Sequence, residues 1–224
     1  MEFRRARNEE QKKIRIDQIL TAAKDLFEML EYKDITLGMI ADKLDFSRAN
    51  MSRYVESKEE IFLLLYIRDM QKLVNELLKV FQNKREIGIP EFAAEFADIC
   101  GAHTVFLRIG AILNTVIEVN ISISRLAECK KLMFAEIQKA AGLLTSIFPF
   151  LQGESVFRFI MMFSTYAQGL YPTSNLSETQ TKAMELAGMP ALHGRFTEDL
   201  KEFIVLMLNG YKGKKRKGCE DNEK

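Results

Sequence analysis

The chain of 224 residues is long enough for one large domain or two small ones, and 47% of its residues are hydrophobic. Its 32 basic and 31 acidic residues leave a net charge of +1, so any nucleic-acid binding has to come from local clusters of charge. Three widely spaced cysteines exclude a disulfide framework and favour a reducing compartment. The charged N-terminal segment is not a secretory signal, and no apolar run approaches a membrane span. We therefore expect a soluble, cytoplasmic protein.

The sequence offers no candidate metal or cofactor site. It has two histidines and lacks CxxC and HExxH motifs. No nucleophile–base pair and no phosphate-binding loop can be identified either. We therefore predict that the protein is not an enzyme and needs no metal or cofactor.

Apolar residues recur every three or four positions along the chain, which is typical of amphipathic helices. Only 4 prolines and 12 glycines interrupt this pattern. We predict an all-α fold with helices over residues 12–30, 37–44, 48–55, 57–82, 91–100, 104–118, 124–148, 154–171, 178–187 and 197–210. Ser57 opens the fourth helix with a capping box, since Glu60 follows three residues later.

The turn between the second and third predicted helices carries a motif. Ala41 is small enough to let a crossing helix approach closely. Asp45 stands where the turn requires a left-handed residue, a conformation that Asp tolerates. Met51 and Val55 give the third helix a buried stripe. This pattern is typical of a helix-turn-helix, although a plain three-helix core would fit it as well.

Residues 15–62 resemble the DNA-binding domain of the TetR family of bacterial repressors. They read RIDQILTAAKDLFEMLEYKDITLGMIADKLDFSRANMSRYVESKEEIF, where the family has ILxAAxxLF, then TxxxIA, then SxxxxYxYFxxKExL. The matching residues are Ile19, Leu20, Ala22, Ala23, Leu26, Phe27, Thr36, Ile40, Ala41, Ser47, Tyr54, Lys58 and Glu59. Three residues depart from the family pattern: Asp45 replaces the usual turn glycine, Ala49 a frequent glycine, and Ser52 a tyrosine that contacts the DNA backbone.

The resemblance implies a linear division of the chain. An N-terminal arm and helix-turn-helix DNA-binding domain would occupy residues 1–56, and a connecting helix residues 57–82. A larger helical ligand-binding and dimerisation domain would follow over residues 83–211, after a linker marked by Gly88 and Pro90. The polar, lysine-rich residues 212–224 are expected to form a disordered tail.

The third helix would present its polar face to DNA. Met51 and Val55 point to the core, so Ala49 and Arg53 centre the opposite face. Arg is suited to guanine and Asn to adenine by bidentate geometry. The predicted base contacts are Arg48, Ala49, Asn50 and Ser52. The predicted phosphate contacts are Thr36, Ser47, Arg53, Tyr54 and Lys58. Without the resemblance, a merely solvated charged face would explain these residues too.

Basic residues also cluster at both ends of the chain. Six of them stand against three acids in the first sixteen residues. This N-terminal cluster could contact phosphates or the minor groove, or serve only as a solubilising tail. We interpret the sequence KGKKRK at residues 212–217 as a solvated tail rather than a DNA contact.

Ten of the 16 phenylalanines lie between Phe81 and Phe163. A cavity lined by such rings would accept an apolar or aromatic ligand, and the resemblance implies a pocket in this half. Ordinary core packing explains each ring equally well. The residues predicted to line the pocket are Phe96, Cys100, His103, Phe106, Asn114, Phe134, Phe163 and Tyr166.

The resemblance also implies a dimer formed by the last two long helices. The last helix carries an apolar stripe wide enough to pack both inward and against a partner. The residues predicted at the interface are Met161, Leu200, Phe203, Ile204 and Met207. We predict a homodimeric regulator, most simply a repressor, that binds a near-palindromic operator and releases it on binding a small apolar or aromatic ligand. The alternative is a helical lipid-binding or carrier protein that has kept this fold without binding DNA.

Overall fold

The computed structural model describes residues 2–45, 47–84, 86–189 and 195–220. The side chains of residues 2–9, 48, 49 and 214–220 lie outside this description. Every regular element in the described ranges is helical, which confirms the predicted all-α fold. None of the helices in these ranges combines the length and the hydropathy that spanning a bilayer requires.

The chain forms two compact units, and the division is not linear. The first unit contains the residues up to Arg68 together with Ile112–Lys131, and the second contains Asp69–Ala111 and the residues from Leu132 onward. The sequence assigned residues 112–131 to the ligand-binding and dimerisation domain. The contacts place this segment with the helix-turn-helix instead.

The first unit begins with α1 (Glu2–Met29), η1 (Tyr32–Asp34), α2 (Leu37–Asp42) and α3 (Arg48–Met51). The first part of α4 (Lys58–Phe81) follows, and later come η2 (Leu113–Ile117), η3 (Glu118–Asn120) and the start of α7 (Ile123–Ile147). Fully buried side chains from several of these elements form its core, with the rings of Phe27 and Phe62 packed edge to face at 5.2 Å.

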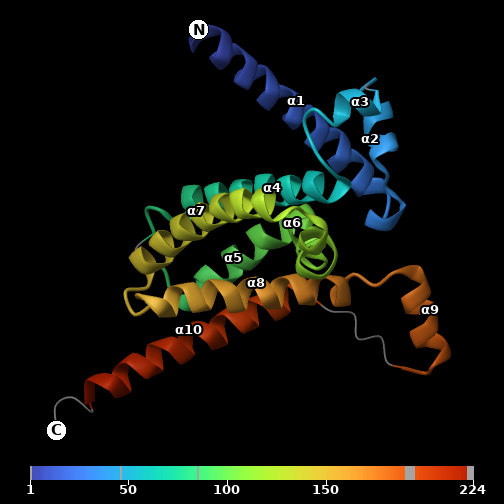
Figure 1. Cartoon of the computed structure of the whole chain (residues 1–224). Coiled ribbons are helices and arrows are strands. Elements are labelled where there is room, and N and C mark those ends of the chain that lie inside the picture. The colour runs from blue at the N-terminus through green and yellow to red at the C-terminus, as the bar shows by residue number, and fades with distance from the viewer. Residues whose placement is uncertain (1, 46, 85, 190–194, 221–224) are drawn as a thin grey trace. The chain divides into compact units, whose positions relative to one another are not determined.

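The second unit contains α5 (Ile89–Ala102), α6 (Thr104–Gly110), α8 (Glu154–Ser174), α9 (Glu178–Leu186) and α10 (Phe196–Glu220), with the remaining parts of α4 and α7. Helix α10 packs on both α5 and α8, and α8 and α10 lie side by side (Figure 1). A chain of touching rings, Phe81, Phe92, Phe96 and Phe163, runs through the core. This ring chain explains why phenylalanine is concentrated in this half of the sequence.

Helix α6 is shorter than predicted: a helix was expected over residues 104–118, and α6 ends at Gly110. Beyond it the backbone forms the π-helical turn η2, in which the amide of Ile117 bonds the carbonyl of Ile112 at 3.2 Å. Gly110 packs against α8 so closely that a Cβ there would lie 2.5 Å from Gln168. A larger residue at this position would therefore have to displace the buried Gln168 side chain.

Several other helix ends differ from the prediction. Helix α1 begins at Glu2 rather than near residue 12. Helix α8 continues past Pro172 to Ser174, and the side chains of Thr173 and Asn175 bond carbonyls of its last turn. The disordered tail predicted from residue 212 is wrong through Glu220, since α10 extends to that residue and Lys and Arg are good helix formers. Residues 221–224 lie outside the described residues.

Candidate functional site

Helices α2 and α3 form the predicted helix-turn-helix. Asp45 has φ of 53°, which confirms the left-handed residue predicted in the turn. Thr36 caps α2 by accepting the amide of Met39 at 3.2 Å, and Ser47 accepts the amide of Asn50 at 3.2 Å. The hydroxyl oxygens of these two predicted phosphate-binding residues therefore cap the N-termini of α2 and α3.

The outer surface of this motif is polar. Met51 and Val55 are buried, as predicted, while Ser52 and Arg53 are exposed and Asn50 is half-buried. Helix α3 ends at Met51. Beyond it, hydrogen bonds between residues three apart continue the turn, such as the one from the Tyr54 amide to the Met51 carbonyl. The side chains of Arg48 and Ala49, both predicted to contact bases, lie outside the described residues.

Two surface hollows bring predicted DNA-binding residues together. One, of about 450 Å³, lies between the start of α2 and the end of α3 and is lined in part by Thr36, Ser52 and Lys58. The other, of about 300 Å³, is lined in part by Arg53 and Tyr54. Five of the described candidates thus line two hollows of the first unit, and Ser52 lines both.

The ammonium group of Lys58 is engaged by the protein itself. It donates to the carbonyls of Tyr32 at 3.0 Å and Ile35 at 2.9 Å, and lies 4.0 Å from the centre of the Tyr32 ring. The Tyr32 hydroxyl donates to Glu59 at 2.8 Å, and burial together with this carboxylate raises the pKa of Tyr32 well above its ordinary value. Lys58 thereby ties the connection between α1 and α2 to α4, and has one N–H donor left for a phosphate.

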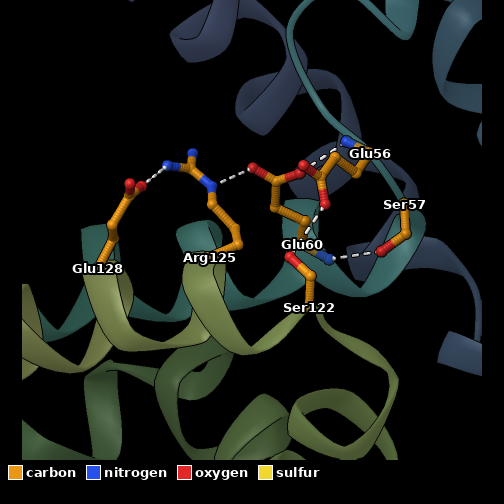
Figure 2. A network of polar contacts seen from close by, with 6 residues as sticks. All are labelled: Glu56, Ser57, Glu60, Ser122, Arg125 and Glu128. Carbon is orange, nitrogen blue, oxygen red and sulfur yellow. Dashed lines mark hydrogen bonds and ion pairs between the residues drawn. The ribbon is translucent and has the colours of Figure 1, made fainter.

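A polar network at the start of α4 was not predicted from the sequence (Figure 2). The Glu60 side chain is only 3% exposed, and its two oxygens accept the backbone amide of Glu56 at 2.6 Å and Nε of Arg125 at 2.5 Å. Ser57 accepts the Glu60 amide at 3.1 Å. This confirms half of the predicted capping box; the Glu60 carboxylate bonds the amide of Glu56 instead of that of Ser57.

The second unit contains an apolar cavity of about 50 Å³. Three predicted pocket residues, Phe96, Phe106 and Phe163, line it. The sequence did not single out the aliphatic part of the lining, which comes from α4 and α7 and includes Met70, Leu73, Ile137, Ala140 and Leu144. Apolar residues spaced three or four apart form the buried face of a helix whether that face packs in a core or lines a cavity. The periodicity of the sequence therefore could not identify these residues as cavity lining.

The other five predicted pocket residues lie elsewhere. Phe134 is 52% exposed and stacks on Phe157, and Tyr166 stacks on Phe203 with ring centres 4.0 Å apart. Asn114 is exposed in η2 and belongs to the first unit. Cys100 and His103 do not line the cavity: Cys100 is fully buried, which raises the pKa of its thiol, and His103 pairs with acids of α4.

His103 stands between two carboxylates at the junction of α5 and α6. Its Nε2 lies 3.0 Å from Glu76, and its Nδ1 lies 3.6 Å from Asp69, which also accepts the amide of Phe106 at 3.1 Å. The carboxylate of Asp69 outweighs burial and raises the pKa of His103, and Glu76 adds to the effect. Burial opposes the lowering of the Asp69 pKa, but His103 and the Phe106 amide outweigh it. The described residues include no cluster of three or more histidine, cysteine or acidic side chains that could hold a metal ion.

The outward faces of α8 and α10 carry part of the predicted dimer interface. Met161 is 58% exposed, and Met207 lines a groove of about 440 Å³ between the two helices. Leu200 and Ile204 are fully buried within the chain, so their prediction as interface residues is corrected. Both lie on the inner side of the wide stripe, which α10 uses to cover the core of its own chain.

One comparison with known protein families identifies the family of this chain. Residues 67–215, more than half of the chain, match the family model described as "Tetracyclin repressor-like, C-terminal domain". The chain belongs to the TetR family of transcriptional regulators. The match lies wholly outside the residues 15–62 that carried the resemblance in the sequence, so the two observations come from different parts of the chain.

One solved structure similar to this TetR-family chain is a transcriptional regulator of the TetR/AcrR family from Thermobifida fusca YX-ER1. The two chains are 19% identical, with a TM-score of 0.49, over 88% of this chain and 98% of the other. The comparison with curated proteins found no match.

The raised pKa of His103 predicts a pH-dependent contribution to stability. Protonated His103 binds two carboxylates, so the contribution is complete below the unfolded-state pKa of about 6.5 and is lost as the pH rises through the higher folded-state pKa. In a background in which the other histidine is replaced, His193→Gln, we expect His103→Gln to lower the free energy of unfolding by about 1.5–3 kcal/mol at pH 6 and by clearly less at pH 9. Urea unfolding at the two pH values measures this difference, and equal losses would contradict the ion pairing.

Proposed function

We propose that the chain is a homodimeric repressor that binds a near-palindromic duplex operator and is released from it by a small apolar or aromatic ligand. The observation that carries this proposal is the helix-turn-helix of a TetR-family chain, closed by the left-handed Asp45. The side chains on the inner face of this motif are buried, whereas those on its outer face are polar and exposed or half-buried. The near-zero net charge leaves DNA binding to this local surface.

The proposed division of roles on DNA follows from side-chain chemistry. Arg48 and Asn50 read bases, while the small Ala49 and Ser52 let α3 enter the major groove deeply. Arg53 and Tyr54, near the end of the motif, hold phosphates together with Thr36, Ser47 and the remaining donor of Lys58.

A dimer is proposed because one helix-turn-helix makes too few base contacts for useful specificity. The α8–α10 groove offers a surface for a second copy, with exposed Met162 and Leu206 beside Met207. Two recognition helices related by a two-fold axis would read two half-sites about 34–36 Å apart.

Ligand release is proposed to act through α4, which has residues in both units. In the first unit α4 carries Lys58, and in the second it lines the cavity with Met70 and Leu73. Its 24 residues make a rod of about 36 Å. A ligand that favours a different position of this rod changes the spacing of the recognition helices, so ligand and DNA oppose each other.

The DNA-binding roles are tested on an operator selected from a pool of random duplexes. We expect Asn50→Ala or Arg48→Ala to relax base preference at one position of each half-site, at a cost of about 1–3 kcal/mol. Arg53→Ala should weaken binding to all sequences similarly and reduce the salt slope by about 0.9 for each lost phosphate contact. Failure to select any operator would contradict the proposal and favour the carrier alternative.

The dimer is tested by charge at its proposed seam. Phe203 of α10 is half-buried and stacks on Tyr166 of α8. Phe203→Asp should give monomers in sedimentation and abolish operator binding. Leu186→Asp is the matched control, because Leu186 is 91% exposed on α9 and lies outside the groove. An intact dimer of Phe203→Asp would rule out this seam.

The antagonism between ligand and DNA is tested with indole, an uncharged aromatic probe. The chain has no tryptophan, so the fluorescence of indole can be followed directly. Indole is larger than the cavity of about 50 Å³, and flexible Met70 is suited to make room for it. We expect saturating operator to weaken indole binding by roughly 5–150-fold. Equal affinity with and without operator would contradict the antagonism, and absence of binding would contradict the proposed ligand class.

A further inference from the structure

We infer that Arg125 of α7 is a positioning residue for DNA binding, which holds the turn between α3 and α4 through the buried carboxylate of Glu60. This inference rests on the proposed function, since it concerns how the same DNA-binding surface is kept in place. Arg125 lies 65 residues from Glu60 in sequence and belongs to the segment 112–131, which packs in the first unit.

The Glu60 side chain connects two parts of the first unit. One of its oxygens accepts the backbone amide of Glu56, which lies in the turn that follows α3, and the other accepts Nε of Arg125. A second link runs beside it, in which the Ser122 hydroxyl donates to Glu56 at 3.2 Å. The turn is thus fixed by two adjacent contacts, one from Ser122 just before α7 and one from Arg125 in the first turn of α7 (Figure 2).

The pairing with Arg125 is what makes a charge at Glu60 tolerable. A buried carboxylate without a cation is strongly unfavourable, whereas a neutral group of similar shape in its place is not. Burial would lower the pKa of Arg125, but its hydrogen bonds to Glu128 and Glu60 outweigh this and raise it, so the guanidinium stays charged. Loss of Arg125 leaves Glu60 either unpaired or drawn toward solvent, and the Glu56 amide moves with it.

The turn held in this way carries residues proposed to contact DNA. Arg53 and Tyr54 lie three and two residues before Glu56, and they line the same hollow as Arg125. A displacement of the Glu56 backbone therefore displaces the proposed phosphate contacts and the end of α3.

A direct phosphate contact by Arg125 is the competing explanation. Its Nε and Nη1 are already bound to carboxylates, at 2.5 Å to Glu60 and 2.6 Å to Glu128. Glu56 adds a third carboxylate to the same hollow. The hollow also contains the cations Lys12 and Arg53, so it is the two carboxylates bound directly to Arg125 that offset its charge and favour the positioning role.

The test is a double-substitution cycle on the full chain. Arg125→Gln alone leaves Glu60 unpaired, and we expect operator affinity to fall about tenfold or more while the salt slope is unchanged. Arg125→Gln combined with Glu60→Gln makes a neutral amide pair that keeps both hydrogen bonds, and affinity should return to within about threefold of the wild type. The control is Lys130→Gln, which removes one cation from the same segment together with its ion pair to Glu118, in which the lysine side chain is 47% exposed, and which should change affinity less than about twofold.

Amide exchange without DNA provides the second readout. In Arg125→Gln we expect faster exchange in residues 52–57 and unchanged exchange in α5 and α10, with normal rates restored in the double variant. If the double variant binds as weakly as Arg125→Gln and both show a smaller salt slope, Arg125 is a phosphate contact and the inference is wrong. Unchanged exchange in Arg125→Gln would also overturn it. If the wild type selects no operator, the proposed function fails, while the exchange measurement still decides whether Arg125 positions the turn.

Discussion

The buried carboxylate of Glu60 is the constraint on which the first unit depends. A charge that is only 3% exposed must be paired, and the cation that pairs with it, Arg125, lies 65 residues away in sequence. Arg125 meets this need, which draws the start of α7 into the first unit. The same carboxylate bonds the amide of Glu56, so one side chain joins the end of the helix-turn-helix, the start of α4 and the start of α7.

Helices α4 and α7 matter because each has residues in both units. In the first unit they are joined by Glu60 and Arg125, and in the second they line one apolar cavity. His103 joins α4 in a comparable way to the junction of α5 and α6, through Asp69 and Glu76. The ion pairs of Glu60 and His103 thus lie where helices meet, while the cavity wall itself is almost entirely apolar.

Lys58 illustrates how a position typical of a family can have a second role. The sequence predicts a phosphate contact, and the structure shows its ammonium group bonding two carbonyls beside the ring of Tyr32. The two roles are compatible, because an ammonium group has three donors. Arg53, which is exposed, offers the simpler test of phosphate binding for this reason.

The sequence by itself determined the all-α class and the left-handed Asp45, because these depend on local periodicity and on turn chemistry that neighbouring residues decide. For the helix-turn-helix, the local pattern also fitted a plain three-helix core, and the resemblance to TetR repressors decided between the two. The sequence also predicted three residues that line the cavity, Phe96, Phe106 and Phe163, since large apolar side chains concentrate wherever a core or cavity forms. Only the tertiary structure decided that Leu200 and Ile204 face inward, that Asn114 belongs to the first unit and that Arg125 pairs with Glu60. A wide apolar stripe has two sides that sequence cannot distinguish, and a charge pair across 65 residues leaves no periodic signal, because its partners meet only when separate helices pack.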